Sequence, residues 1–581
     1  MSEIDEQNGR LRSFLIANVG SSNTHVALID VAGRSYRLIA QASAPTTASA
    51  PWSNVMLGVR AAIKQVEVIT GRPLLTDREV LIRPAKENGS GVDLFAAVTS
   101  AASPLKVWLV GLSDEISLAS GRRTLRQSYT QEIGVLGLEN GRSESDHLND
   151  FINHAPDFVF VVGGTDGSHN EHLLHQLEQV AMGAGILTGS KRVRVIYAGN
   201  RELRERVRRL VGQNASLQIA ENIHPTLGHE MLTDATQVIG ELYNDLKVYG
   251  LSGIQELLEW CHEPPRPTAN ALLTMLRYFA TLYKGHVFGI DLGSQHTTLL
   301  SATPDTARLR IDSQLGLGRP VTALLQKTSL ENIGRWLPEP MATADIENFV
   351  YNKSVSPHTL PQTRQELWLE QAIAREMLRC AAEETLSEWG WEHGIPSLRL
   401  LLVRGGIFTN QARPNELVRM LLDVLPLRGI FALAIDEHGV LPGLGMLAHN
   451  EPLAVVQTLE AGVLNDVGWV IVPSGAAQPG ETILDLVVQP AETARFEAEI
   501  VAGNLEILPL AAGQQAELVL KPRGGIDVGF GPGRGKKVTV FGGSLGLIVD
   551  ARKRPLSLPT DDNERTKLLA AWQREMGVVF D

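Results

Sequence analysis

Two glycine turns, each set between apolar strands, constrain the fold of this chain more than any other feature. The first is FLIANVGSSNTHVALIDV, from Phe14 to Val31, and the second is HVFGIDLGSQHTTLLSA, from His286 to Ala302. Each predicts a strand, a tight turn and a second strand. A hairpin without a ligand satisfies this pattern. A loop whose backbone N–H groups and hydroxyls surround a phosphate satisfies it equally well.

Three further glycine loops follow predicted apolar strands. They are the loops after Phe158–Val162, Val193–Tyr197 and Leu398–Val403. Strand-to-helix loops at the carboxyl edge of a parallel sheet are where α/β folds bind ligands. Each loop alone is as well explained as a turn, but the loops taken together favour a nucleotide cleft.

Short β-branched runs alternate with longer helical patterns, which predicts an α/β fold. After about Glu451 the pattern changes to short strands broken by turns, which is typical of a separate β domain. The proline cluster Pro264–Pro267 is the best candidate boundary before that point. We therefore expect a first lobe over 11–265, a second lobe over 266–450, a β-rich domain over 451–560 and a C-terminal helix over 561–581.

Composition limits the classes of partner. The 581 residues carry a formal charge of -12, which argues against nucleic acid or an anionic membrane surface as a partner. Cys261 and Cys380 stand far apart, which fits a reducing compartment and excludes a cysteine-rich metal site. No apolar run approaches the roughly 18 residues of a membrane span, and the first residues lack the pattern of a signal peptide. These features predict a cytoplasmic protein.

Several segments, taken in order, carry a family resemblance. They are NVGSSNTHVALIDV, AVTSAASPLKVWLVGL, PDFVFVVGGTDGSHNE, GIDLGSQHTTLLS and RGGIFTN. This series resembles the glutamate mutase L family, which belongs to the actin, sugar-kinase and heat-shock-chaperone ATPase superfamily. The resemblance runs from about residue 14 to residue 448 and leaves the β-rich C-terminal domain unexplained.

The resemblance implies two actin-like, ribonuclease H-like lobes with ATP and Mg²⁺ between them, followed by a separate mostly-β domain. It implies a chaperone or reactivation factor whose protein partner is an adenosylcobalamin-dependent glutamate mutase, and end-to-end assembly of the lobes as a homo-oligomer is a further expectation. Asp291 and Asp166 become the candidate catalytic residues, and Asp291 would hold Mg²⁺ through water. The candidate nucleotide-binding residues are Asn18, Gly20, Ser21, Ser22, Thr24, Gly163, Gly164, Thr165, Gly293, Ser294, Thr297, Gly405 and Gly406. The last two would lie under the adenine or ribose.

The chain departs from the family pattern at residues that carry charge. Asn18 stands where the family has Asp, and His25 stands where it has Lys. In the second turn, bulkier residues replace small ones, and Thr298 takes the place of a second Asp. Phosphoryl transfer depends on positioning and charge stabilisation, so each change weakens the case for hydrolysis. Three hypotheses stay open: a nucleotide-dependent chaperone with weak ATPase activity, a catalytically degenerate scaffold that binds other proteins, and a small-molecule kinase of the same superfamily. The kinase needs a carboxylate base, which nothing in the sequence singles out.

Two smaller patterns admit a structural and a functional interpretation. His25 and His296 are either surface histidines or replacements for the missing cationic contacts to phosphate. The segment GFGPGRGKKVTV resembles a phosphate-binding P-loop, but Phe530 and Lys537 stand where that motif needs Gly and Ser or Thr. We expect a basic β-hairpin tip there instead.

Overall fold

The structure, a computed structural model, describes residues 12–138, 143–168, 171–187, 192–212, 214–409 and 413–577. Residues 11 and 578–581, at the ends of the predicted first and last domains, and Asn410 of the RGGIFTN segment lie outside these ranges. The chain forms two compact units. The first contains the residues up to Ala101, Gln255–Leu309 and everything from Gln314, and the second contains Ala102–Ile254 and Arg310–Ser313.

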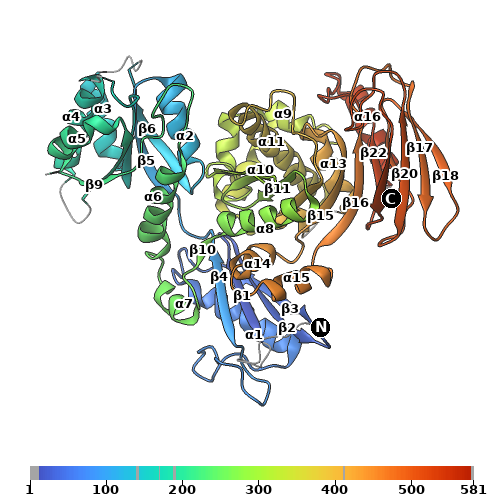
Figure 1. Cartoon of the computed structure of the whole chain (residues 1–581), viewed down its shortest axis with the longest axis horizontal. Helices are drawn as coiled ribbons and strands as arrows, with labels where there is room; N and C mark the ends of the chain where they lie inside the picture. Colours follow the sequence, from blue (N-terminus) through green and yellow to red (C-terminus); the bar gives the residue numbers. More distant parts are fainter. Residues whose placement is uncertain are drawn as a thin grey trace. The chain divides into compact units, whose positions relative to one another are not determined.

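The first glycine turn joins two antiparallel strands of a five-stranded sheet in the first unit (Figure 1). In sheet order the strands are β3 (Ser35–Pro45), β2 (Asn23–Ala32), β1 (Phe14–Val19), β4 (Leu94–Thr99) and β10 (Arg266–Pro267). β4 runs parallel to β1 and β10 runs parallel to β4. The predicted boundary at the proline cluster thus contributes an edge strand to this sheet. The helices packed against the sheet are α1 (Val55–Thr70), α8 (Thr268–Tyr283), α14 (Leu441–Leu447) and α15 (Pro452–Glu460).

The second glycine turn repeats this arrangement in a second sheet of the same unit. The strands are β13 (Ala307–Asp312), β12 (Thr297–Ala302), β11 (Val287–Leu292), β14 (Leu400–Arg404) and β15 (Gly429–Ile435). β11 and β12 are antiparallel, whereas β14 and β15 run parallel to β11. In both sheets the strands therefore lie in the order 3-2-1-4-5 of a ribonuclease H-like lobe. The predicted pair of actin-like lobes is confirmed.

Helices cover the second sheet and build an extensive hydrophobic core with it. They are the 3₁₀ helix η4 (Arg319–Gln326), α9 (Leu330–Gly334), α10 (Thr343–Val355), α11 (Arg364–Glu388), α12 (Gly406–Thr409) and α13 (Pro414–Val424). α11 begins with a capping box formed by Thr363 and Glu366, which satisfies backbone N–H groups at its start. Its apolar side chains Leu369, Ile373 and Met377, which recur at helical spacing, are buried in the core.

The C-terminal part is mostly β, as expected, and it continues the sheet of the second lobe. Three strands extend that sheet beyond β15: β16 (Asn465–Val472), β22 (Gly546–Asp550) and β19 (Leu505–Leu508). The others form a separate antiparallel sheet in the order β18 (Phe496–Val501), β17 (Thr482–Pro490), β20 (Gln515–Pro522) and β21 (Lys536–Phe541). Ile471 and Val549 of the extension share one core with Leu486 and Leu518 of the separate sheet. The helix α16 (Asp562–Glu575) follows.

The second unit is a doubly wound parallel sheet inserted after β4. Its strand order is β6 (Thr130–Leu136), β5 (Leu105–Val110), β7 (Phe158–Gly163), β8 (Arg194–Gly199) and β9 (Ser216–Ile219), and all neighbours are parallel. Its helical segments are η1 (Asp114–Leu118), α2 (Ala119–Leu125), α3 (Glu144–His154), α4 (Glu171–Ile186), η2 (Arg201–Leu203), α5 (Arg204–Val211), α6 (Thr233–Tyr243) and η3 (Asn244–Val248). α7 (Ile254–Trp260) leads back to the first unit. β7 is buried along its whole length, as expected for a strand covered on both faces. Within the described ranges, no helix is long and apolar enough to cross a membrane.

Candidate functional site

The first hairpin is closed by its own backbone and tied to β3. Gly20 N donates to Asn23 O (3.0 Å), and a Cβ at Gly20 would lie 2.7 Å from that oxygen, so only glycine fits the turn. Ser21 and Ser22 at the tip are partly exposed. The buried Thr24 hydroxyl instead bonds the Thr46 hydroxyl (2.8 Å), which places its hydrogen bond inside the protein.

The second hairpin has the same turn but is covered by a following segment. Gly293 N donates to His296 O (2.9 Å), as Gly20 does in the first hairpin. The segment 315–318 lies against the tip, because Gly318 N donates to Ser294 O (2.7 Å) and Thr297 Oγ1 donates to Leu315 O (2.9 Å). A Cβ at Gly318 would lie 2.1 Å from Ser294 Oγ. The Ser294 and Thr297 hydroxyls therefore face this segment.

Ser100, which follows β4, connects the two hairpins. Its N–H donates to Val19 O at the end of β1 (3.0 Å), and its backbone is hydrogen-bonded to the His296 side chain. His296 belongs to the second hairpin and is 7% exposed, so its side chain is buried next to Ser100. The two turns that the sequence pairs by pattern are therefore neighbours in one unit.

Asp291, the predicted magnesium ligand, is paired with an arginine. Arg404 Nη1 donates to Asp291 Oδ2 (2.9 Å), from the facing position of the neighbouring strand β14. Burial raises the pKa of Asp291 although Arg404 opposes that shift. In the described part of the chain, no three His, Cys, Asp or Glu side chains are grouped so that they could hold a metal ion. A guanidinium on the carboxylate repels a divalent cation, so the residues around Asp291 do not fit Mg²⁺.

Asn18 on β1 and Gly405 after β14 each contact the backbone of another loop or strand end. Asn18 is buried, and its Nδ2 donates to Gly439 O (3.3 Å) in the loop after β15. Gly405 has φ of 123°, and a Cβ there would lie 2.2 Å from Leu292 O at the end of β11. The loop that begins with Gly405 and Gly406 thus lies directly against the second hairpin, where only glycine allows this approach.

Asp166 belongs to the second unit, with Gly163, Gly164 and Thr165. Its Oδ1 accepts hydrogen bonds from Arg201 N and Asn222 Nδ2 (both 2.9 Å), which join the loops after three neighbouring strands. Burial opposes ionisation, but these bonds outweigh it and lower the pKa of Asp166. The structure therefore assigns Asp166 a loop-fixing contact, in a different unit from Asp291.

Comparison with known proteins gives the family. The family model described as MutL protein matches residues 14–463, which is well over half of the chain. The chain belongs to the MutL protein family. Protein MutL of Clostridium tetanomorphum is 19% identical over 497 residues, which cover 77% of this chain and 98% of that protein. The match to the family model ends at residue 463, just before β16 begins at Asn465.

Two solved structures align with this MutL family chain at low TM-scores. Diol dehydratase-reactivating factor in its nucleotide-free form is 11% identical, with a TM-score of 0.30, over 78% of this chain and 99% of that one. Nucleotide-free acetone carboxylase is 10% identical, with a TM-score of 0.33, over 84% of this chain and 81% of that one.

Three residues at the site were not among the functional residues predicted from the sequence of this MutL family chain: Ser100, Arg404 and Asp436. Arg404 immediately precedes the Gly405–Gly406 pair, and Asp436 immediately follows the next strand, β15. Arg404 could have been found from the sequence, because it is the charged residue directly after the predicted strand Leu398–Val403, whereas no strand was predicted before Asp436. Ser100 acts through its backbone, which no residue-type pattern reveals.

The backbone of the P-loop-like segment binds a carboxylate of the same chain, Asp527, which lies two residues before it. Asp527 Oδ1 accepts hydrogen bonds from the backbone N–H groups of Gly529, Phe530 and Gly531 (2.7, 3.0 and 2.9 Å). Lys536 at the start of β21 lies over the Phe530 ring (4.7 Å), and a strand follows where a P-loop needs a helix. The segment is therefore a turn between strands, as expected.

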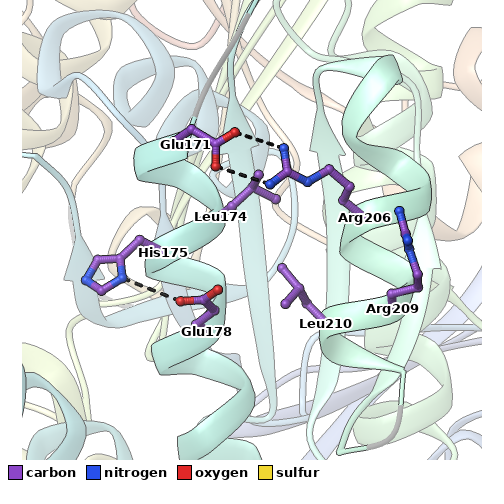
Figure 2. A pocket seen from close by; sticks show the side chains of 7 residues that line it. All are labelled: Glu171, Leu174, His175, Glu178, Arg206, Arg209 and Leu210. Carbon is purple, nitrogen blue, oxygen red and sulfur yellow. Dashed lines mark hydrogen bonds and ion pairs between the residues drawn. The ribbon is translucent and has the colours of Figure 1, made fainter.

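An open hollow of about 480 Å³ lies between α4 and α5 of the second unit (Figure 2). Glu171 accepts two hydrogen bonds from Arg206 (2.9 and 3.1 Å) across it, and His175 lies 3.6 Å from Glu178. None of the predicted site residues lines this hollow. Glu171 is thus paired with Arg206, and Arg209 Nε donates to the Glu205 backbone oxygen (3.4 Å).

The two histidines of the hairpins should make the protein sensitive to acid. Burial lowers the pKa of His296 to about 4, against the effect of its bond to Ser100, and burial with the Arg404 charge lowers that of His25 to about 4. Both are neutral at pH 7, so neither supplies a cation to phosphate. Unfolding releases them to take up protons below about pH 6.5, so stability falls as pH drops toward 4.

We expect His296 alone to account for a loss of about 2 kcal/mol between pH 7 and pH 5. Urea unfolding at both pH values should show that loss reduced by this amount in His296→Asn. His449→Asn, at an exposed position, should leave the wild-type difference unchanged. Equal losses in His296→Asn and wild type would contradict the expectation.

Proposed function

We propose that this protein is a nucleotide-binding accessory protein of the glutamate mutase L type. The observation that carries the proposal is the junction at Ser100, which sets two glycine hairpins side by side in one unit of a MutL family chain. Glycine turns permit close approach of backbone N–H groups to phosphate oxygens. The first hairpin is better suited to this task, because Ser21 and Ser22 are partly exposed.

The remaining nucleotide contacts belong to the same proposal. The Gly405–Gly406 loop lies against the second hairpin, which supports a place for the adenine or ribose beside it. The Gly163–Asp166 loop stands in the other unit, so its contribution to a phosphate site rests on the resemblance alone.

The second candidate, a scaffold without ATP hydrolysis, is favoured by the Asp291–Arg404 pair. Phosphoryl transfer in this superfamily needs charge stabilisation at the transferred group, usually through Mg²⁺. Here the carboxylate expected to hold that ion accepts a hydrogen bond from Arg404 Nη1 at 2.9 Å. We therefore propose nucleotide binding with slow or absent turnover.

The proposed partner is a protein, an adenosylcobalamin-dependent mutase. The net charge of -12 disfavours nucleic acid. If the protein reactivates such a mutase, adding it with ATP to the inactivated enzyme restores activity. Recovery without nucleotide would support the scaffold instead.

Adding a negative charge at the first hairpin tests nucleotide binding directly. We expect Ser21→Asp to weaken ATP binding about tenfold or more, because like charges at the tip repel phosphate. Calorimetric titration with ATP, with and without Mg²⁺, measures the affinity. Ser35→Asp makes the same change at the start of β3, about 30 Å along β2 from the tip, and should bind like wild type. Equal binding by both variants would place the nucleotide elsewhere, and no binding by wild type would leave only the scaffold.

A further inference from the structure

Arg404 lies at the meeting point of three strand ends in the first unit. It is the last residue of β14, pairs in register with Asp291 on β11, and is followed by the Gly405 loop. Its side chain is 10% exposed and that of Asp291 is 19% exposed. A guanidinium so far removed from solvent needs compensating carboxylates.

The second carboxylate comes from Asp436, which is completely buried. Asp436 Oδ2 lies 3.6 Å from Arg404 Nε, and the two carboxylate oxygens accept hydrogen bonds from Val440 N (3.0 Å) and Leu441 N (3.1 Å). Asp436 thus caps the start of α14 while it faces Arg404. The Arg404 guanidinium is thus held between two carboxylates, one on β11 and one directly after β15, the two strands that flank β14.

The other side of Arg404 faces the first hairpin. A Cβ built on Gly439 would lie 3.9 Å from both Arg404 Nη2 and His25 Cγ, and Gly439 O accepts the Asn18 amide. Arg404 therefore stands beside the first strand pair as well as the second. This is the place where an ion bridging the phosphate tail and Asp291 would have to stand.

We propose that Arg404 takes the place of the divalent cation at Asp291, so that a phosphate group between the hairpins is bound without metal. Mg²⁺ would require the Asp291 carboxylate, whose Oδ2 accepts from Arg404 Nη1, and it would meet a fixed positive charge. Guanidinium groups bind phosphate oxygens with several N–H donors. The inference deepens the proposed function and rests on it for the phosphate, but not for the metal.

Metal alone tests the first half. Mn²⁺, a paramagnetic substitute for Mg²⁺, is titrated and followed by electron paramagnetic resonance. We expect wild type and Asp291→Asn to bind Mn²⁺ equally, because Asp291 holds no metal in the wild type. Arg404→Gln should bind one Mn²⁺ at least tenfold more tightly than wild type. The gain should disappear in Arg404→Gln combined with Asp291→Asn. Arg404→Lys keeps the positive charge and should resemble wild type.

Arg72→Gln is the matched control, because it removes an arginine from another partly buried pair, Arg72 Nη1–Asp30 Oδ2 at 2.5 Å. It should gain no Mn²⁺. A wild-type Mn²⁺ site that depends on Asp291, or a folded Arg404→Gln without any gain, would overturn the proposal. If circular dichroism shows that Arg404→Gln does not fold, wild type against Asp291→Asn decides the question.

Nucleotide tests the second half. ADP affinity of wild type in EDTA and in Mg²⁺ should agree within twofold, and Arg404→Gln should bind ADP more weakly in EDTA than in Mg²⁺. A wild-type affinity that falls tenfold in EDTA would overturn the proposal. No ADP binding under either condition would refute the proposed function, while the Mn²⁺ titration still decides what occupies Asp291.

Discussion

Replacing Asp423 with Asn should lower the free energy of unfolding by about 3–5 kcal/mol, the usual cost of breaking a buried ion pair. Asp423 on α13 is fully buried and accepts hydrogen bonds from Arg375 Nε on α11 (2.9 Å) and Arg552 Nη1 after β22 (2.8 Å). Arg419 Nε lies 3.5 Å away. The variant leaves these guanidiniums in the core without a full countercharge.

Asp423 also predicts the direction of acid sensitivity. Burial opposes its ionisation, but Arg419, Arg552 and Arg375 outweigh it and lower the pKa of Asp423 to about 2. The stabilising contribution is therefore complete above the unfolded pKa near 3.8 and is lost as pH falls toward 2. Asp423→Asn should remove this part of the pH dependence.

Denaturant unfolding followed by tryptophan fluorescence is a suitable measurement, because Arg552 lies over the Trp572 ring at 4.6 Å. The control is Asp485→Asn, which breaks an exposed pair with Arg523 on the separate β sheet. Such a surface pair contributes below about 1 kcal/mol. Similar losses in the two variants would show that the buried cluster does not hold the C-terminal strands to the second lobe.

Gly445→Ala should destabilise the contact between the lobes by about 3 kcal/mol, in the range expected for overpacking. A Cβ at Gly445 on α14 would lie 2.0 Å from Ala271 O on α8. α8 contacts β11 and β12 of the second sheet as well as β4 and β10 of the first, whereas α14 contacts β1 and β4. The two backbones must separate to admit a methyl group, and the two lobes separate with them.

Scanning calorimetry measures the effect as a lower melting temperature of the first unit. Gly240→Ala is the matched control, because Gly240 lies in the helix α6 and a Cβ there meets nothing within 4 Å. That change should stabilise the second unit by up to about 1 kcal/mol through helix propensity. If Gly445→Ala left the melting temperature of the first unit unchanged, α8 and α14 could separate to admit the methyl group without loss of free energy, which would contradict the prediction.

The hairpins and the two lobes were predictable because their signals are local. An apolar run followed by Gly20 or Gly293 specifies strand and turn within a few residues, and the capping box at Thr363 is a four-residue pattern. The direction in which each side chain of a strand faces was harder to predict. The hydroxyls of Thr24 and Thr297 look like phosphate ligands in the sequence but are bonded inside the protein.

Pairing between distant strands was beyond the sequence. Asp291 and Arg404 are 113 residues apart, and their contact depends on the register of β11 against β14. The continuation of the second lobe through β16 and β22 likewise depends on which strand edges meet. Such choices follow from tertiary packing and topology, which residue types in a single chain do not specify.

The eight-stranded sheet also has a mechanical consequence. In the C-terminal part, β16, β22 and β19 continue the hydrogen-bonded sheet of the lobe that carries the second hairpin, with β16 next to β15 (Figure 1). The separate four-stranded sheet packs on this extension through a shared core. A rigid rotation of that lobe about the α8–α14 crossing would carry the C-terminal strands with it as a lever arm. Points far from the pivot travel farthest, so a small shift at Gly293 would become a larger one at β18. The position of the outer face of the four-stranded sheet would then change with the position of the second hairpin, and a protein bound to that face would move with it.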